Sequence, residues 1–338
     1  MTEHHFIVIG NGPAGNKAAL TLRDKAPDAR ITLISRRHGG CYRPHLLPYF
    51  IAGEISEDDL YVFSPSSYKE KNIKLRNGQQ VVDVNPERRE VVLDHKEILP
   101  FHGLIIAVGG KPRIPERLTV FRDLMLTLKT LEDARAWIKK LPGVDAVLMI
   151  GGDLTSFGFT KALISMGKKI YFALNEDAFW PLRFNNALFE EVAHKLVERG
   201  IEVLKHSHLK QMTLLPDGTI EVQMGHEMIR VGLIGAFFGL IPDIQFIARS
   251  GFRIDRGILV DEYLNAGFEG IYATGDCAQV YHPELRDYWV SIGHDNAVHL
   301  GRIAALNLAG AKIQAKVAKE SIFEVQGIKV NTSWWTEF

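Results

Sequence analysis

The stretch FIVIGNGPAG, residues 6–15, decides the fold of this chain. It joins an apolar run typical of a buried strand to a G-x-G-x-x-G turn, after which a helix opens and a second strand follows at 31–34. Gly10 allows the tight bend, Gly12 lets the backbone approach a pyrophosphate, and Gly15 lets the helix pack against the strand. The helix N-terminus stabilises phosphate charge. Strand, turn, helix and strand in this order predict a dinucleotide-binding unit.

Composition narrows the class of protein further. The chain has 338 residues, which allows two or three domains, and its formal net charge of zero gives no sign of nucleic-acid binding. The first strand begins by residue 6, and no apolar run approaches the roughly twenty residues of a membrane span. We therefore expect a cytoplasmic protein without a signal peptide or a membrane span.

Metal and disulfide chemistry are not expected from the cysteine and histidine spacing. The two cysteines, Cys41 and Cys277, form no C-x-x-C, iron–sulfur or disulfide pattern. His206 and His208 stand two apart on an expected strand without a third ligand nearby. The sequence therefore predicts no metal site.

The strand–turn pattern of the opening stretch recurs later in the chain. It returns at residues 146–153, followed by an expected helix over 160–166 and a strand over 170–174. Between the two copies we expect a helical linker over 54–73, a hairpin at 81–84 and 90–93, a buried strand at 104–110, and a proline-rich boundary at 111–115. A third segment carries apolar runs at 257–261 and 271–276 and an expected helix over 296–308.

Three motifs in this order resemble the two-dinucleotide-binding-domain flavoproteins, the pyridine nucleotide–disulfide oxidoreductase superfamily. They are Gly10 to Gly15, Ala107 to Gly110 and Thr274 to Asp276. The resemblance implies an α/β fold with two Rossmann-like domains, the second inserted into the first. It places the FAD-binding domain at 1–113 and 236–315, a degenerate NAD(P)-binding-like domain at 114–235, and a short C-terminal segment at 316–338. By the same resemblance the cofactor is FAD, and Asp276 binds its ribityl chain.

Within the superfamily the chain is most similar to the FAD module of NAD(P)H nitrite reductase and to ferredoxin-reductase-like enzymes. Residues 42–49, YRPHLLPY, are similar to their Y-x-R-P-x-L segment, which implies that Arg43 and Pro44 lie along the flavin and pyrophosphate. A surface arginine is the alternative for Arg43. No catalytic side chain is implied. The expected FAD-binding residues are Gly10, Gly12, Pro13, Ala14, Gly15, Ser35, Arg36, Arg43, Pro44, Val81, Ala107, Gly109, Gly275 and Asp276.

The second turn departs from the family pattern G-x-G-x-x-G-x-E at several positions. Asp153 replaces the glycine that approaches the pyrophosphate, and its carboxylate adds bulk and like-charge repulsion. Ser156 replaces the packing glycine, Gly158 the acid, and Leu174 stands where an acid would bind the adenosine ribose. These changes predict that NAD(P)H no longer binds there. The alternative is an altered pose in which Asn175 or Glu176 holds the ribose.

The first site and the thiol positions also depart from the family. The run Ser35-Arg36-Arg37-His38 lacks the usual ribose-binding acid, although Ser35 could hydrogen-bond and Arg36 or Arg37 could stack on adenine. Leu46 occupies the position of the second redox cysteine, and His45 the position of the single thiol in the peroxidase and coenzyme-A-disulfide branch. We therefore interpret Cys41 and Cys277 as packing residues.

Three functions follow from this combination. The favoured one is an FAD-binding electron-transfer subunit that exchanges electrons with a redox protein partner, without a working NAD(P)H site. The first alternative is a free-standing NAD(P)H-dependent flavoprotein reductase of a small redox protein, and the second is a non-catalytic scaffold. Trp334 and Trp335 indicate either a homo- or hetero-oligomer interface or packing onto the molecule's own sheet.

Overall fold

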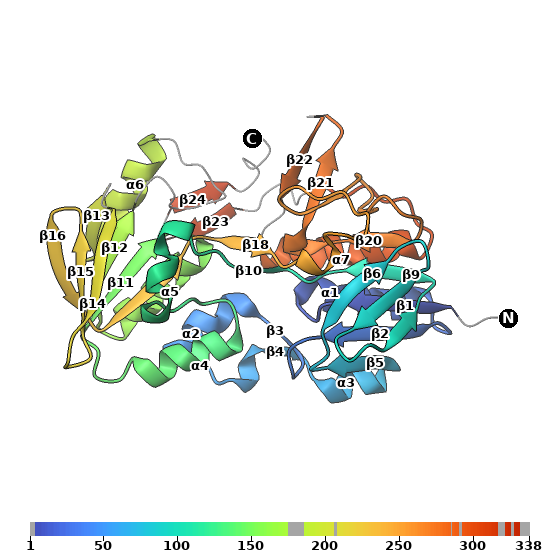
Figure 1. The fold of residues 1–338 in the computed structure, drawn as a ribbon, viewed down its shortest axis with the longest axis horizontal. Coiled ribbons are helices and arrows are strands. Elements are labelled where there is room, and N and C mark those ends of the chain that lie inside the picture. Colours follow the sequence, from blue (N-terminus) through green and yellow to red (C-terminus); the bar gives the residue numbers. More distant parts are fainter. Residues whose placement is uncertain are drawn as a thin grey trace.

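Two parallel sheets, each flanked by helices, form the body of the molecule (Figure 1). The structure, a computed structural model, describes residues 4–174, 186–205, 208–284, 286–290, 293–316, 322–325 and 328–331. Asn175, Glu176, His206, Trp334 and Trp335, to which the sequence assigned roles, lie outside these ranges.

The first sheet has the strand order β20-β9-β1-β2-β5, and all its neighbouring strands are parallel. Every residue of β1 is buried, because both faces of this parallel sheet are covered by other elements and no polar side remains. Helices α1 and α7 cross closely, since a Cβ at Gly301 would lie 2.2 Å from the carbonyl oxygen of Ala14. The elements are β1 (His5–Ile9), β2 (Arg30–Ser35), β5 (Ile73–Asn77), β9 (Gly103–Ile106), β20 (Ile271–Ala273), α1 (Pro13–Lys25) and α7 (His294–Leu308).

The second sheet has the order β13-β12-β11-β17 and is also parallel. Its core contains Trp137 and Phe159, whose ring centroids lie 4.6 Å apart. The elements are β11 (Ala146–Gly151), β12 (Lys169–Leu174), β13 (Glu202–Lys205), β17 (Leu233–Phe237), α4 (Leu131–Lys140), α5 (Leu154–Ser165) and α6 (Asn186–Val197).

The second sheet is inserted into the first. The chain leaves the first sheet through β10 (Gly110–Pro112) and returns through β18 (Leu240–Pro242), and these two strands pair antiparallel. Strand β20 then rejoins the first sheet. Because β17 belongs to the second sheet and runs to Phe237, two residues past the expected boundary at 235, we propose the β10–β18 pair as the division between the domains.

Smaller elements complete the described fold. They are β3 (Cys41–Tyr42), β4 (Tyr61–Phe63), β6 (Val81–Asn85), β7 (Glu90–Leu93), β8 (Ile98–Pro100), β14 (Leu209–Leu214), β15 (Ile220–Met224), β16 (Glu227–Val231), β19 (Ile258–Val260), β21 (Ala278–His282), β22 (Asp287–Val290), β23 (Ile322–Val325), β24 (Ile328–Asn331), α2 (Leu47–Ile51), α3 (Pro65–Glu70), and the 3-10 turns η1 (Pro44–Leu46), η2 (Asp58–Leu60), η3 (Glu116–Leu124), η4 (Gln245–Ile247) and η5 (Gly275–Cys277).

Local expectations from the sequence are confirmed for the hairpin, now β6 and β7, and corrected at two elements. The helix expected over 160–166 begins at Leu154, because Asp153 caps it and starts it earlier. The strand expected over 104–110 ends at Ile106, since the chain turns at Gly109, whose φ is +66°, before β10 begins.

Candidate functional site

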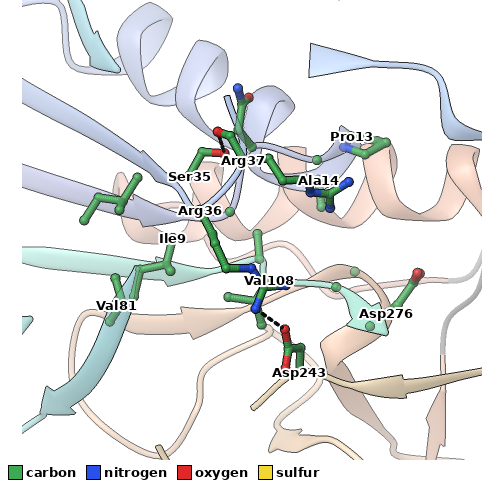
Figure 2. Close-up of a pocket in the computed structure, with 18 of the residues that line it drawn as sticks. Ile9, Pro13, Ala14, Ser35, Arg36, Arg37, Val81, Val108, Asp243 and Asp276 are labelled. Atoms are coloured by element: carbon green, nitrogen blue, oxygen red, sulfur yellow. Dashed lines mark hydrogen bonds and ion pairs between the residues drawn. The ribbon is translucent and has the colours of Figure 1, made fainter. Parts of the chain in front are cut away.

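A cavity of about 240 Å³ opens at the carboxyl ends of β1, β2, β9 and β20 (Figure 2). This is the place where open parallel sheets bind ligands. All of the expected FAD-binding residues line it except two. Gly15 packs beneath the turn, and the Arg43 side chain donates to the carbonyl oxygen of Asp59 at 3.3 Å. The residues that do line it are Gly10, Gly12, Pro13, Ala14, Ser35, Arg36, Pro44, Val81, Ala107, Gly109, Gly275 and Asp276.

The first glycine turn is packed on one side and open on the other. A Cβ at Gly10, whose φ is +107°, would lie 2.2 Å from the carbonyl oxygen of Ala107, and one at Gly15 would lie 1.8 Å from that of Gly10. A Cβ at Gly12 would meet nothing within 4 Å. Gly12 is the N-cap of α1 and provides no side-chain cap, so the first N–H groups of the helix are available to a phosphate.

The end of the cavity near β2 is crossed by an ion pair. The guanidinium of Arg36 lies 3.1 Å from the carboxylate of Asp243, and Figure 2 shows this contact spanning the site. The Arg36 side chain is 60% exposed, so solvent screens the pair and a ligand can displace it at little cost. Beside it, Ser35 donates its hydroxyl hydrogen to the carbonyl oxygen of Arg37 at 2.8 Å.

The opposite end of the cavity carries polar groups suited to a ribityl chain. Lys129 Nζ lies 3.4 Å from the Asp276 carboxylate, both side chains being largely buried. Thr274 Oγ1 at this end is buried without a hydrogen-bond partner among the described residues, and so is Asn11 Nδ2 in the first glycine turn. Such atoms are costly unless a ligand satisfies them. The open turn, the polar end and the apolar strand ends between them therefore fit FAD.

Several lining residues were not found from the sequence. Gln79, Gln80, Lys129, Asp243, Gln245 and Phe246 all reach the cavity. No motif marks them. Lys129 lies in the inserted half of the chain and Asp243 follows β18, so only the return of the chain along the β10–β18 pair brings them to the site.

The second glycine turn contains an acidic side chain that caps the helix after it. The Asp153 carboxylate accepts hydrogen bonds from the backbone N–H of Ser156 at 2.9 Å and of Gly239 at 3.2 Å. The Ser156 hydroxyl in turn accepts from the backbone N–H of Asp153, which completes a capping box at the start of α5. Desolvation raises the pKa of the Asp153 carboxyl despite these bonds. Leu174, at the expected ribose position, is fully buried.

The two cysteines have the properties of packing residues. Both are buried and free. Burial raises the pKa of the Cys41 thiol to about 12 and that of Cys277 to about 11. A thiol with so high a pKa is a poor nucleophile at neutral pH.

The fold and the first site together define a flavin- and nucleotide-binding oxidoreductase. Residues 4–294 match the family model described as pyridine nucleotide-disulphide oxidoreductase, and the chain belongs to this family. It is an FAD-dependent oxidoreductase. FAD bound here would supply hydride and electron transfer.

Relatives of known name cover most of the chain. Putidaredoxin reductase of Pseudomonas putida is 28% identical over 90% of this chain and 74% of its own length. An NADH oxidase of Methanocaldococcus jannaschii is 26% identical over 98% of this chain and 76% of its own.

Solved structures confirm the fold. The covalent putidaredoxin reductase–putidaredoxin complex matches with a TM-score of 0.85 at 22% identity, over 96% of this chain and 79% of that one. An NAD-dependent persulfide reductase from A. fulgidus matches with a TM-score of 0.86 at 24% identity, over 95% and 62%. Within the described residues, no helix combines the length and apolar character needed to cross a bilayer.

Proposed function

We propose that this chain is an NAD(P)H-dependent flavoprotein reductase that passes electrons from FAD to a small redox protein. The observation that carries the proposal is the similarity to putidaredoxin reductase over nine-tenths of the chain, together with an open first turn that fits FAD. These relatives favour the first alternative of the sequence analysis over an electron-transfer subunit without NAD(P)H. The buried, high-pKa thiols support an acceptor that takes electrons from the flavin itself.

In this function each part of the site has a defined task. The N-terminus of α1 stabilises the pyrophosphate charge, and Asp276 with Lys129 fixes the ribityl chain. FAD can accept two electrons together as a hydride and release them singly, which suits it to link a nicotinamide to a one-electron partner. No side chain needs to act as a general acid or base for the hydride step.

One observation favours a second candidate, the electron-transfer subunit that does not use NAD(P)H. The Asp153 side chain accepts from the backbone N–H of Ser156 in the first turn of α5, and a helix N-terminus is where the pyrophosphate of a nicotinamide dinucleotide would bind. In this candidate a protein partner both delivers and removes the electrons.

Anaerobic visible spectra of the purified protein decide between the two. We expect the oxidised flavin spectrum to bleach rapidly with NADH or NADPH, after which adding an oxidised one-electron acceptor protein should restore it. A spectrum that survives both nucleotides but bleaches with dithionite would refute the NAD(P)H-dependent reductase and support the second candidate. A colourless protein that cannot be loaded with FAD would support a scaffold. The cytoplasmic location and the oligomer interface through Trp334 and Trp335 stay predictions.

A further inference from the structure

Two imidazole rings meet beside the FAD site on segments far apart in the sequence. His45 lies in η1, and His294 is the first residue of α7. Their ring centroids are 4.5 Å apart, and the ring planes are tilted by 59°. Both rings have close chain neighbours that line the cavity, because Pro44 precedes His45 and Ala297 follows His294 by one helical turn. Neither ring lines the cavity itself, so the pair lies behind the residues that form its wall.

The two rings differ in their access to water. His45 is exposed, whereas His294 is partly buried. Atom Nδ1 of His294 is buried and has no hydrogen-bond partner among the described residues. The His45 ring can exchange protons with solvent. The His294 ring has a nitrogen, Nδ1, that can bind a proton or form a hydrogen bond when its surroundings change.

The surroundings of the pair lower the pKa of both rings, chiefly through loss of solvation. Partial desolvation of the His45 ring, which still reaches solvent, lowers its pKa, and His294 and Arg43 lower it further against the opposing carboxylate of Asp295. Burial also lowers the pKa of His294, where Asp295 opposes and Arg43 adds to the effect. Arg43 and Asp295 are the charged groups that act on both rings. A new negative charge nearby would raise both pKa values.

Reduction of bound FAD by two electrons with uptake of only one proton would leave one additional negative charge at the flavin, which is such a charge. We propose that the His45–His294 pair takes up one proton from solvent when the neighbouring FAD is reduced, and releases it when FAD is reoxidised. The electron donor supplies both electrons, water supplies the proton through His45, and the net charge of the pair rises by one. The inference rests on the FAD binding of the proposed function, but it needs neither NAD(P)H nor the redox partner.

The midpoint potential of bound FAD, measured against pH with dithionite and a redox dye, tests this proposal in the full-length protein. In a pH window just above the lowered histidine pKa, we expect the wild type to take up one more proton per two electrons than the variants do. His45→Gln and His294→Gln should each remove this extra uptake. His226→Gln is the matched control, because His226 is exposed on the β15–β16 turn. It should leave the pH profile unchanged.

Parallel pH profiles for the wild type and both variants would overturn the proposal, since a structural or purely electrostatic role shifts the potential equally at all pH values. If the variants do not retain FAD, NMR titration of the histidine rings in the wild type gives the second test. We expect the pKa of the pair to be higher with reduced FAD than with oxidised FAD, and an unchanged pKa refutes the pair's role. A wild type that cannot bind FAD would refute the FAD-dependent function itself, which is a different result.

Discussion

The two glycine turns of this molecule pack their first glycine in the same way, but they differ in the group that caps the N-terminus of the helix that follows. A Cβ at Gly10 would lie 2.2 Å from the carbonyl oxygen of Ala107, and one at Gly151 would lie 2.2 Å from that of Phe237. The N-cap of α1 is Gly12, without a side chain, whereas the N-cap of α5 is Asp153, whose carboxylate bonds to the helix N-terminus. The strand–turn–helix geometry is therefore maintained by packing in both turns, while the N-terminus of the helix is open at α1 and capped by a side chain at α5.

The strongest way to break this difference is to give the first turn the cap of the second. In Gly12→Asp, the new carboxylate can accept from the N–H of Gly15, as Asp153 accepts from Ser156. It would then repel the pyrophosphate, and we expect FAD affinity to fall at least ~100-fold, or about 3 kcal/mol. The flavin-to-protein ratio after purification measures the loss.

Gly12→Ala is the control for this substitution, because a Cβ there has open space. It should lose far less flavin than Gly12→Asp, and a thermal melt should show both variants folded. A Gly12→Asp protein that retains a full complement of FAD would show that an N-cap carboxylate does not close such a turn.

The reverse exchange tests the second turn. In Asp153→Gly, the N–H groups of Ser156 and Gly239 lose their internal acceptor, so we expect NADH affinity to rise roughly 10-fold whatever its starting value. Replacing an Asp N-cap by glycine costs roughly a few tenths of a kcal/mol of stability, so we expect the variant to fold. Anaerobic calorimetric titration with NADH measures the change, with ADP-ribose as the non-reducing control. Unchanged affinity would mean that Leu174 or Gly158 limits binding instead.

The charge of Asp153 should be visible in the pH dependence of stability. Desolvation raises the pKa of this carboxyl above its unfolded value, so ionisation costs stability as the pH rises through the interval between the two pKa values. Asp153→Asn keeps the cap and removes the charge. We expect it to be more stable than the wild type at pH 7, with the difference shrinking below about pH 4. Thermal melts from pH 3.5 to 8 measure this difference, and one that does not vary with pH would contradict a strained ionised carboxylate.

Most of the first site could be predicted from the sequence, because its residues belong to local motifs that follow strand ends. Residues such as Gly12, Ala107 and Asp276 lie in the turn directly after their strand, so once the strand is recognised the place of the motif at the carboxyl end of the sheet follows. That an acidic side chain stands in the second glycine turn can also be seen in the sequence, whereas the hydrogen bond that Asp153 accepts from Gly239 cannot.

The rest of the site depends on contacts between distant segments, which spacing does not encode. Asp243 reaches Arg36 because β18 pairs with β10, and His294 reaches His45 because α7 packs against the first turn. The sequence places the start of α5 too late, at residue 160. Asp153 is the N-cap of the helix, and the sequence motif marks this residue only as a clash with phosphate. The sequence is thus compatible with two roles for the Asp153 side chain, repulsion of a phosphate and capping of a helix, and the structure shows the capping.

The mildest test of the comparison concerns Gly158, where the family places an acid. Gly158 lies inside α5, and a Cβ there would meet only the Pro48 side chain at 3.7 Å, an ordinary contact. Gly158→Ala should therefore stabilise the protein by about 0.5–1 kcal/mol through helix propensity, measured by denaturant unfolding. Gly15→Ala, in the first turn of α1, should instead destabilise it by about 1–3 kcal/mol, because its Cβ would lie 1.8 Å from the carbonyl oxygen of Gly10. If Gly158→Ala were destabilising, α2 and α5 would have to be packed too tightly for a side chain at this position. The absence of the family's acid at Gly158 would then be a requirement of the fold and would carry no information about nucleotide binding at the second turn.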